Sequence, residues 1–186
     1  MTITSFTPRV RSVLVKRGAY RGTRCPMKKI QLGGRYKKKI SGYALVDDED
    51  FNELSKYKWH LAVGYAKCGV PSKGKWRNIS MHQIIMSTPK GMDTDHIDGN
   101  RLNNQKANLR ICTHAQNNHN SKIPKNNTTG FKGVVFHRNT KKFMAQIAVN
   151  KKRIYLGLFS SLKEAALAYN EGAKKYHGEF ANLNPL

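Results

Sequence analysis

The segment "DTDHIDGNRLNNQKANLRICTHAQNNHN", residues 93–120, constrains the possible fold more than any other part of the chain. "DTDHI" and "NLRICT" are short extended pieces, and the polar loop between them contains an Asp-Gly turn signal. Thr113 stands three residues before Gln116, a capping-box pattern that predicts the first turn of a helix. The segment therefore predicts a strand, a loop, a strand and a helix in about thirty residues, the size of one supersecondary unit.

The chain around this segment is strongly basic, and its acids are gathered in the middle. Lys and Arg total 34 against 11 Asp and Glu, which gives a formal charge of +23. Residues 1–46 contain no acid, whereas residues 47–121 contain eight of the eleven. Such an excess of positive charge favours a polyanionic partner, with nucleic acid as the first candidate and an anionic membrane as the second. No apolar run is long enough to cross a bilayer, so the sequence predicts no membrane-spanning segment.

The three cysteines, Cys25, Cys68 and Cys112, are far apart and form no CxxC pair. An odd and scattered set argues against a disulfide framework and against a zinc site with four cysteine ligands. A reducing cytosol suits a chain of this kind.

The regions on either side of the central segment have their own patterns. We interpret residues 1–41 as a basic arm, either a solvated tail or a tail that lies along phosphates. Residues 43–46 predict a strand, and the acids from residue 47 onward predict capping of the helix that follows. "WHLAVGYAKC" and "KWRNISMHQIIM" predict two strands, the second running into a short helix. Residues 122–129 are a linker by composition.

The adjacent pair Asp95 and His96 indicates a phosphodiesterase site. If the predicted helix packs against the first strand, a carboxylate and a side-chain oxygen could together hold a hard divalent cation such as Mg²⁺. A neutral histidine beside them could take a proton from water, and the cation would stabilise charge on the phosphate. The alternative is an ordinary surface turn. Asp98 suits the Asp-Gly turn, Asp93 has no assigned role, and we interpret His82 as a buried, hydrogen-bonded histidine.

The segment "DHIDGNRLNNQKANLRICTHAQNNHN" resembles the HNH nuclease motif, in the version common among phage and bacterial homing endonucleases. The resemblance extends upstream through "YALVDDEDFNELSKYKWHLAVGYA" and "MHQIIM", and it covers about residues 43–121. It implies the ββα-metal fold over residues 42–121 and metal-dependent hydrolysis of DNA.

This resemblance also implies one role for each of four residues. Asp95 is expected to be a metal ligand, His96 the general base, and Asn108 a residue that bonds the loop backbone and steadies the finger. Asn117 is expected to be the second metal ligand, with His119 as a less favoured alternative. An amide oxygen suits Mg²⁺ or Mn²⁺ and argues against zinc. The paired cysteines that hold a structural zinc in some relatives are missing from this sequence, so no structural zinc is expected.

The pieces "KGV", "FMAQI", "YLGLF", "EAALAYN" and "HGEFANLN" resemble the AP2 DNA-binding domain over residues 130–184. The resemblance implies a three-stranded antiparallel sheet packed on one helix, with its outer face in the major groove. The apolar alternation over residues 143–149 agrees with this fold. The family's DNA-contacting positions fall on Lys132, His137, Lys142, Gln146, Arg153 and Tyr155. Val135 and Ala148 stand where many plant relatives have Arg, so the target sequence of those relatives does not transfer.

Together these patterns predict an α+β chain with a nuclease module at residues 42–121, a linker at 122–129 and an AP2 module at 130–186. We expect a metal-dependent endonuclease that acts on double-stranded DNA in a bacterial host cytoplasm or nucleoid, as a monomer or alternatively a dimer. One rival hypothesis is a non-catalytic DNA-binding regulator with a vestigial nuclease module. Another is a protein that binds or cuts RNA, because net charge does not distinguish the two nucleic acids.

Overall fold

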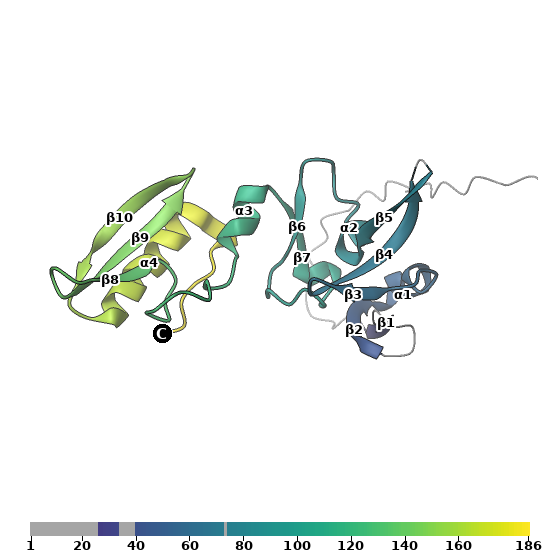
Figure 1. Ribbon diagram of the computed structural model, residues 1–186, viewed down its shortest axis with the longest axis horizontal. Coiled ribbons are helices and arrows are strands. Elements are labelled where there is room, and N and C mark those ends of the chain that lie inside the picture. Colours follow the sequence, from purple (N-terminus) through teal and green to yellow (C-terminus); the bar gives the residue numbers. More distant parts are fainter. Residues whose placement is uncertain (1–25, 34–39, 73) are drawn as a thin grey trace, which may run out of the picture.

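The computed structural model describes residues 26–33, 40–72 and 74–186, which form two units that follow each other along the chain (Figure 1). The first unit holds a five-stranded and a two-stranded sheet, and the second holds a three-stranded sheet. With the helices described below, the chain has the mixed α+β composition that the sequence predicts. Among the described residues, no helix is both long and apolar enough to cross a membrane.

The five-stranded sheet has the strand order β2-β1-β3-β4-β5. Its strands are β1 (Met27–Gly33), β2 (Ile40–Asp47), β3 (His60–Ala62), β4 (Tyr65–Ser72) and β5 (Lys75–Ser80). Its helices are α1 (Asp48–Leu54), which follows β2, and α2 (Met81–Ile85), which follows β5. Strands β1 and β3 meet in parallel at one residue pair, Gly33 with His60. "WHLAVGYAKC" contributes two strands rather than the one predicted, because Val63 and Gly64 adopt positive φ and reverse the chain.

Part of the region predicted to be an arm, residues 1–41, belongs to this sheet. The structure places residues 27–33 in β1, which pairs antiparallel with β2. Ile30 and Leu32 point into the core, while the residues between and before them stay exposed. The run of lysines hides this alternation in the sequence. Residues 1–25 of the predicted arm lie outside the described residues.

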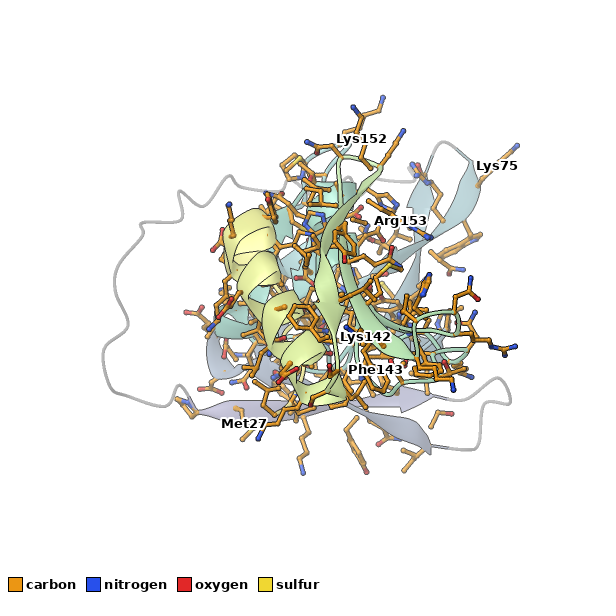
Figure 2. The ribbon with its side chains drawn as sticks, turned by 90° about the vertical axis from the view of Figure 1, so that its left-hand side faces the viewer. Met27, Lys75, Lys142, Phe143, Lys152 and Arg153 are labelled. Carbon is orange, nitrogen blue, oxygen red and sulfur yellow. The ribbon has the colours of Figure 1, made fainter. Side chains whose placement is uncertain are left out.

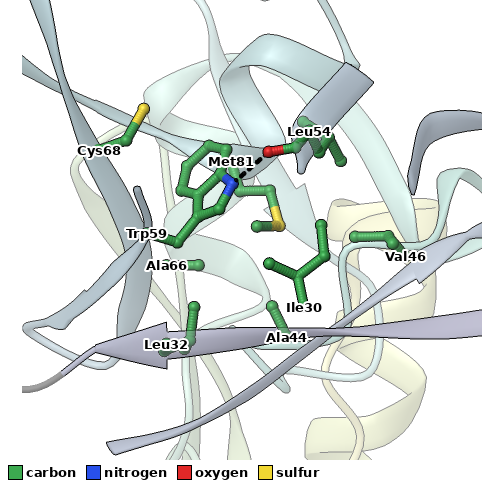
Figure 3. Packing of buried hydrophobic residues seen from close by; sticks show 9 residues of the cluster. All are labelled: Ile30, Leu32, Ala44, Val46, Leu54, Trp59, Ala66, Cys68 and Met81. Carbon is green, nitrogen blue, oxygen red and sulfur yellow. Dashed lines mark hydrogen bonds between the residues drawn. The ribbon is translucent and has the colours of Figure 1, made fainter. Parts of the chain in front are cut away.

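The core of the first unit lies between the five-stranded sheet and the helices α1 and α2 (Figure 3). Its buried residues are Ile30, Leu32, Ala44, Val46, Leu54, Trp59, Ala66, Cys68 and Met81. The indole nitrogen of Trp59 donates to the carbonyl oxygen of Leu54 at 2.7 Å, so the ring's polar atom is satisfied inside the core. Met81 is fully buried, and it anchors α2 and therefore the neighbouring His82.

The central segment forms the strand, loop, strand and helix that the sequence predicts. These elements are β6 (Asp93–His96), β7 (Leu109–Cys112) and α3 (His114–His119), and β6 pairs antiparallel with β7. The capping box of α3 is present, with the Thr113 side chain accepting from the Gln116 amide. Leu45 on β2 ties the loop to the large sheet, because its backbone bonds to Leu102 and Asn104, both at 2.8 Å.

The second unit is an antiparallel sheet with the order β10-β9-β8, covered on one face by a helix. Its elements are β8 (Val134–His137), β9 (Lys142–Val149), β10 (Lys152–Phe159) and α4 (Leu162–His177). Gly133 precedes β8 with φ of +73°, and a Cβ there would lie 2.1 Å from the ring of Tyr169 on α4. Only glycine therefore allows the strand to approach the helix this closely.

The two units meet where α3 and α4 end. The imidazole rings of His119 and His177 stack at a centroid distance of 3.7 Å. The Nζ atom of Lys132 donates to the backbone oxygens of His119 and Ser121, at 2.6 and 2.7 Å. The second unit is therefore attached to the end of the helix that follows β7, and not only by the intervening chain.

Candidate active site

A hollow of about 730 Å³ opens beside β6, the loop that follows it and the end of α3. Its lining comprises Gly64, Tyr65, Thr94, Asp95, His96, Gly99, Asn100, Arg101, Leu102, Asn117, Asn118, Asn120, Ser121 and Lys122. Three of the four residues expected in a nuclease site, Asp95, His96 and Asn117, line this one hollow. The fold thus brings together side chains from β6 and α3 that are separated in sequence.

The carboxylate of Asp95 is almost fully buried, with 6% of its side chain exposed. Arg110 donates to its Oδ2 atom from Nε at 2.9 Å and from Nη2 at 2.7 Å. The Nδ2 atom of Asn120 lies 3.0 Å from both carboxylate oxygens. Burying a carboxylate is costly unless it is paired and hydrogen-bonded, and Arg110 and Asn120 meet both conditions. The sequence spacing assigned no role to either residue.

His96 is held by a side chain of the loop. Its Nε2 atom lies 3.3 Å from the amide oxygen of Asn104, which is itself buried. An amide oxygen only accepts, so Nε2 carries the hydrogen and Nδ1 is the unprotonated nitrogen of the neutral ring. Burial lowers the pKa of His96 below its ordinary value, although the Asn104 hydrogen bond opposes this shift. The ring is therefore neutral at neutral pH, the form that can accept a proton.

His82 packs against His96, and nothing in the sequence placed it at this site. The two rings meet edge to face, with centroids 5.0 Å apart, and Tyr65 packs on His82 at 5.3 Å. His82 is buried as predicted, and burial together with the charge of a protonated His96 lowers its pKa to about 4. His82 comes from α2, fourteen positions before His96, so only tertiary packing brings it here.

Asn108 lies in the loop, where it closes the turn that carries Asp98. Its Oδ1 atom accepts from the Asp98 amide at 3.0 Å, and its Nδ2 atom donates to the Asp98 carboxylate and to the Asn103 carbonyl, both at 2.9 Å. Asp98 also accepts from the amide of Asn100 at 2.7 Å, the pattern of an Asx turn. These bonds lie within the loop and hold its shape.

Asn117 projects from α3 toward the start of β6. Its Nδ2 atom donates to Asp93 Oδ2 at 3.1 Å, and His114 Nδ1 lies 3.0 Å from the same oxygen. The hydrogen bond from Asn117 is the main cause that lowers the pKa of Asp93, which keeps that carboxylate ionised. The hydrogen bond from the Asn117 Nδ2 atom to Asp93 fixes the plane of the amide group, and it therefore also fixes the direction of the Asn117 amide oxygen.

A second acidic group, Asp47, Glu49 and Asp50, gathers at the start of α1. Lys106 lies among these acids, with Nζ at 2.5 Å from Glu49 and 2.9 Å from Asp50. The Asp47 side chain makes no cap bond to α1, contrary to the prediction. It accepts instead from the Lys106 amide at 2.8 Å and from Gln105 at 3.1 Å. These acids therefore tie the loop to the large sheet.

The residues expected to contact DNA lie mostly on the face of the second unit's sheet that α4 leaves open. His137 pairs with Lys142, and Gln146 pairs with Tyr155, so these side chains share one face. Arg153 lies on the same face, opposite Ala148. Figure 2 shows α4 on one side of the strands and Arg153 on the other. Tyr155 is 59% exposed on this face.

Lys132 is placed differently from the other expected DNA contacts. Its ammonium group is used in the contact between the units, and burial lowers its pKa to about 8. It therefore holds the end of α3 rather than standing free for a phosphate.

Comparison with known proteins places this geometry in a family. The family model for HNH endonucleases matches residues 87–119, which span β6, β7 and α3. The chain is 29% identical to "Uncharacterized HNH endonuclease L560" of Acanthamoeba polyphaga mimivirus, over 77% of this chain and 75% of that protein. It is 34% identical to "Protein 3.8" of Escherichia phage T7, over 51% of this chain and 78% of that protein. No solved structure gives a significant match.

A separate likeness covers about a third of the chain. The "AP2-like ethylene-responsive transcription factor TOE2" of Arabidopsis thaliana is 34% identical over 61 residues, which is 33% of this chain and 13% of that protein.

The HNH family match covers the ββα unit in which β6 carries Asp95 and His96 and α3 carries Asn117. The chain belongs to the HNH endonucleases, with relatives in viruses and phages. It is accordingly a DNA-cleaving enzyme.

Proposed function

We propose that the chain is a divalent-metal-dependent DNA endonuclease, in which the first unit cuts and the second unit binds the duplex. The observation that supports this most directly is the shared lining of one hollow by Asp95, His96 and Asn117. The geometry joins a carboxylate, an amide oxygen and a neutral imidazole, which are the groups that metal-assisted phosphodiester hydrolysis requires.

The oxygen atoms available in the hollow fit a hard cation. Asp95 and Asn117 both offer oxygen, and Mg²⁺ and Mn²⁺ are bound by few protein oxygens together with water. Arg110 occupies Oδ2 of Asp95, which leaves Oδ1 as the oxygen with fewer partners. The ion, when bound, supplies a Lewis acid that stabilises charge on the scissile phosphate and its leaving oxygen.

His96 takes the proton from the attacking water in this proposal. Its neutral ring accepts at Nδ1, because Nε2 is committed to Asn104. The edge of His82 restricts the ring's rotation, and Asn104 restricts its tilt. A general base held in one orientation does not have to be ordered again at each turnover.

Positive side chains at the rim can hold the phosphates beside the scissile bond. Arg101 and Lys122 both line the hollow. The Arg101 guanidinium lies 4.6 Å from the Tyr65 ring and donates to the carbonyl oxygen of Val63 at 3.2 Å. That arrangement keeps one edge of the guanidinium available for a phosphate oxygen.

The second unit is proposed to bind duplex DNA in the manner of an AP2 domain. Support comes from the open face that carries Lys142, Gln146 and Arg153, and from the likeness to the plant protein. Arg and Gln can read base edges in the major groove, and Lys can pair with phosphates. The chain is expected to act as a monomer, because among its described residues one hollow is lined by Asp95, His96 and Asn117 together.

A plasmid-nicking assay tests this function. The wild-type protein should convert supercoiled plasmid with Mg²⁺ or Mn²⁺ and not with EDTA, and His96→Ala should lose roughly a hundredfold or more in rate. His60→Ala is the matched control, since His60 lies in β3 and does not line the hollow. Duplex binding without metal-dependent cleavage would support the regulator hypothesis instead. Equal rates for His96→Ala and wild type would remove His96 as the base.

A further inference from the structure

Arg110, the charged partner of Asp95, is itself held by the end of the chain. Two of its nitrogens bind Asp95, and the third, Nη1, donates to the carbonyl oxygen of Glu179 at 2.6 Å. The guanidinium carbon lies 4.0 Å from the centroid of the Phe180 ring, a cation–π contact. Glu179 and Phe180 follow α4, so Arg110 bridges the nuclease carboxylate and the second unit.

Asn120, the other partner of Asp95, is held in the same way. Its Nδ2 atom donates to Asp95 and, at 2.9 Å, to the carbonyl oxygen of His96. Its own carbonyl oxygen accepts from Nδ2 of Asn182 at 3.0 Å, and the Asn182 amide also reaches the carbonyl of Ser121 at 3.1 Å. The backbone on which Asn120 stands is therefore fixed from the second unit.

The segment that makes these contacts is anchored firmly to the second unit. The backbone amide of Asn184 donates to Oδ1 of Asn170 at 2.7 Å, and Asn170 belongs to α4. The side-chain oxygen of Asn184 accepts from the Lys132 amide at 2.6 Å. Phe180 is buried, with 7% of its surface exposed. Residues 179–182 are thus a rigid extension of the second unit and not a loose tail.

We propose that Phe180 and Asn182 are positioning residues of the nuclease reaction, acting on Asp95 through Arg110 and Asn120. This inference rests on the proposed role of Asp95 as a metal ligand. Partners of a metal-binding carboxylate fix its orientation and tune its affinity for the ion. Without Phe180, the Arg110 side chain regains rotational freedom. Without Asn182, the backbone that carries Asn120 is no longer held from the second unit. In either case the Asp95 carboxylate loses part of what fixes its orientation. The second unit therefore contributes to the cutting step as well as to DNA binding.

The experiment uses the full chain with Asn182→Ala and Phe180→Leu. Asn182→Ala removes a half-buried amide, Phe180→Leu keeps the site apolar but removes the ring, and Leu183→Ala is the control at a neighbouring exposed residue. Mn²⁺ binding is measured by electron paramagnetic resonance on DNA-bound protein that also carries His96→Ala, so that the duplex stays intact. Both variants should bind Mn²⁺ about tenfold more weakly and, in the otherwise wild-type chain, show a lower kcat on saturating duplex.

Two further results separate positioning from general damage. Duplex affinity should be unchanged in both variants, and Phe180→Tyr, which keeps the ring, should restore Mn²⁺ binding. If the Phe180→Leu protein does not fold, the Mn²⁺ affinity and kcat of Asn182→Ala alone test the proposal. A wild-type protein that never cleaves would defeat the proposed function itself. A wild-type protein that cleaves, beside an Asn182→Ala variant with unchanged Mn²⁺ affinity and kcat, would defeat only this inference.

Discussion

The Nε2 atom of His96 lies 3.3 Å from the Oδ1 atom of Asn104, and Asn104 is 1% exposed. This contact sets which ring nitrogen of His96 is free, because the amide oxygen requires a hydrogen on Nε2. Asn104 is itself fixed, since its backbone amide bonds to Leu45 on β2 at 2.8 Å. The large sheet thus determines the tautomer of the proposed base, although none of its strands supplies that base.

Asn104→Ala should lower kcat roughly tenfold on saturating duplex, because His96 would lose its preferred tautomer and tilt. Asn104→Asp keeps an acceptor oxygen and should retain most of kcat. The added carboxylate should raise the pKa of His96, so the acid limb of the pH–rate profile should move to higher pH. An equal fall in kcat for Asn104→Ala and Asn104→Asp, with no shift of the pH–rate profile, would contradict this role of Asn104.

The stability of the folded chain should fall as the pH falls below about 6.5. Burial lowers the pKa of His82 to about 4, so the unfolded chain binds a proton that the folded chain rejects. The stability linked to His82 is fully present above the unfolded pKa and is lost between pH 6.5 and 4, by up to about 3 kcal/mol. The pKa of His96 is lowered as well, so it acts in the same direction.

His82→Phe tests this pH dependence. Urea unfolding of wild type and variant at a series of pH values should give a shallower pH slope for the variant, with the remaining slope assigned to His96 and other groups. Identical slopes would mean that His82 titrates normally in the folded protein.

Gly133→Ala should destabilise the second unit by on the order of 3 kcal/mol. The new methyl group would meet the Tyr169 ring at 2.1 Å, and the φ of +73° is unfavourable for alanine. Gly130→Ala is the matched control, because Gly130 has φ of +75° and open space around its Cα. Thermal unfolding should show a small loss for Gly130→Ala and a much larger loss for Gly133→Ala. Equal losses would mean that backbone conformation alone requires the glycine.

Arg153→Ala should weaken duplex binding about tenfold while leaving kcat on saturating duplex unchanged. Arg153 lies on the open face of the sheet, far in sequence from the hollow and not among the described residues that line it. Lys163→Ala removes the same charge from the exposed side of α4 and should change affinity much less. Binding isotherms at two salt concentrations distinguish a base contact from a general loss of positive charge.

Local signals were sufficient for much of this fold. Thr113 and Gln116 marked the start of α3, and alternation over residues 143–149 marked β9, because capping and pleating depend on neighbours in sequence. The resemblance to the HNH motif implied one site for Asp95 and Asn117, and both line the hollow. Strand β1 was missed because its apolar alternation is short, comprising Ile30 and Leu32 directly after two lysines.

The partners of the site residues could not be predicted in this way. Asn104, Arg110 and Asn120 are polar residues in a segment rich in them, and nothing in spacing separates those that reach Asp95 or His96 from those that face solvent. His82 reaches the site from a helix whose position depends on the packing of Met81. The contacts of all four residues with Asp95 or His96 depend on tertiary structure, and they form only when the sheet and the ββα unit are assembled.

The residues after α4 that hold Arg110 and Asn120 lie beyond the sheet and helix of the second unit, for which we proposed DNA binding. An engineer who exchanges that sheet and helix to redirect cutting to a new target would therefore need to keep Glu179–Asn182 together with Arg110 and Asn120. The boundary of such a fusion then decides the outcome. A replacement domain that extends over residues 179–182 would change the target specificity and would also remove a support of the nuclease unit.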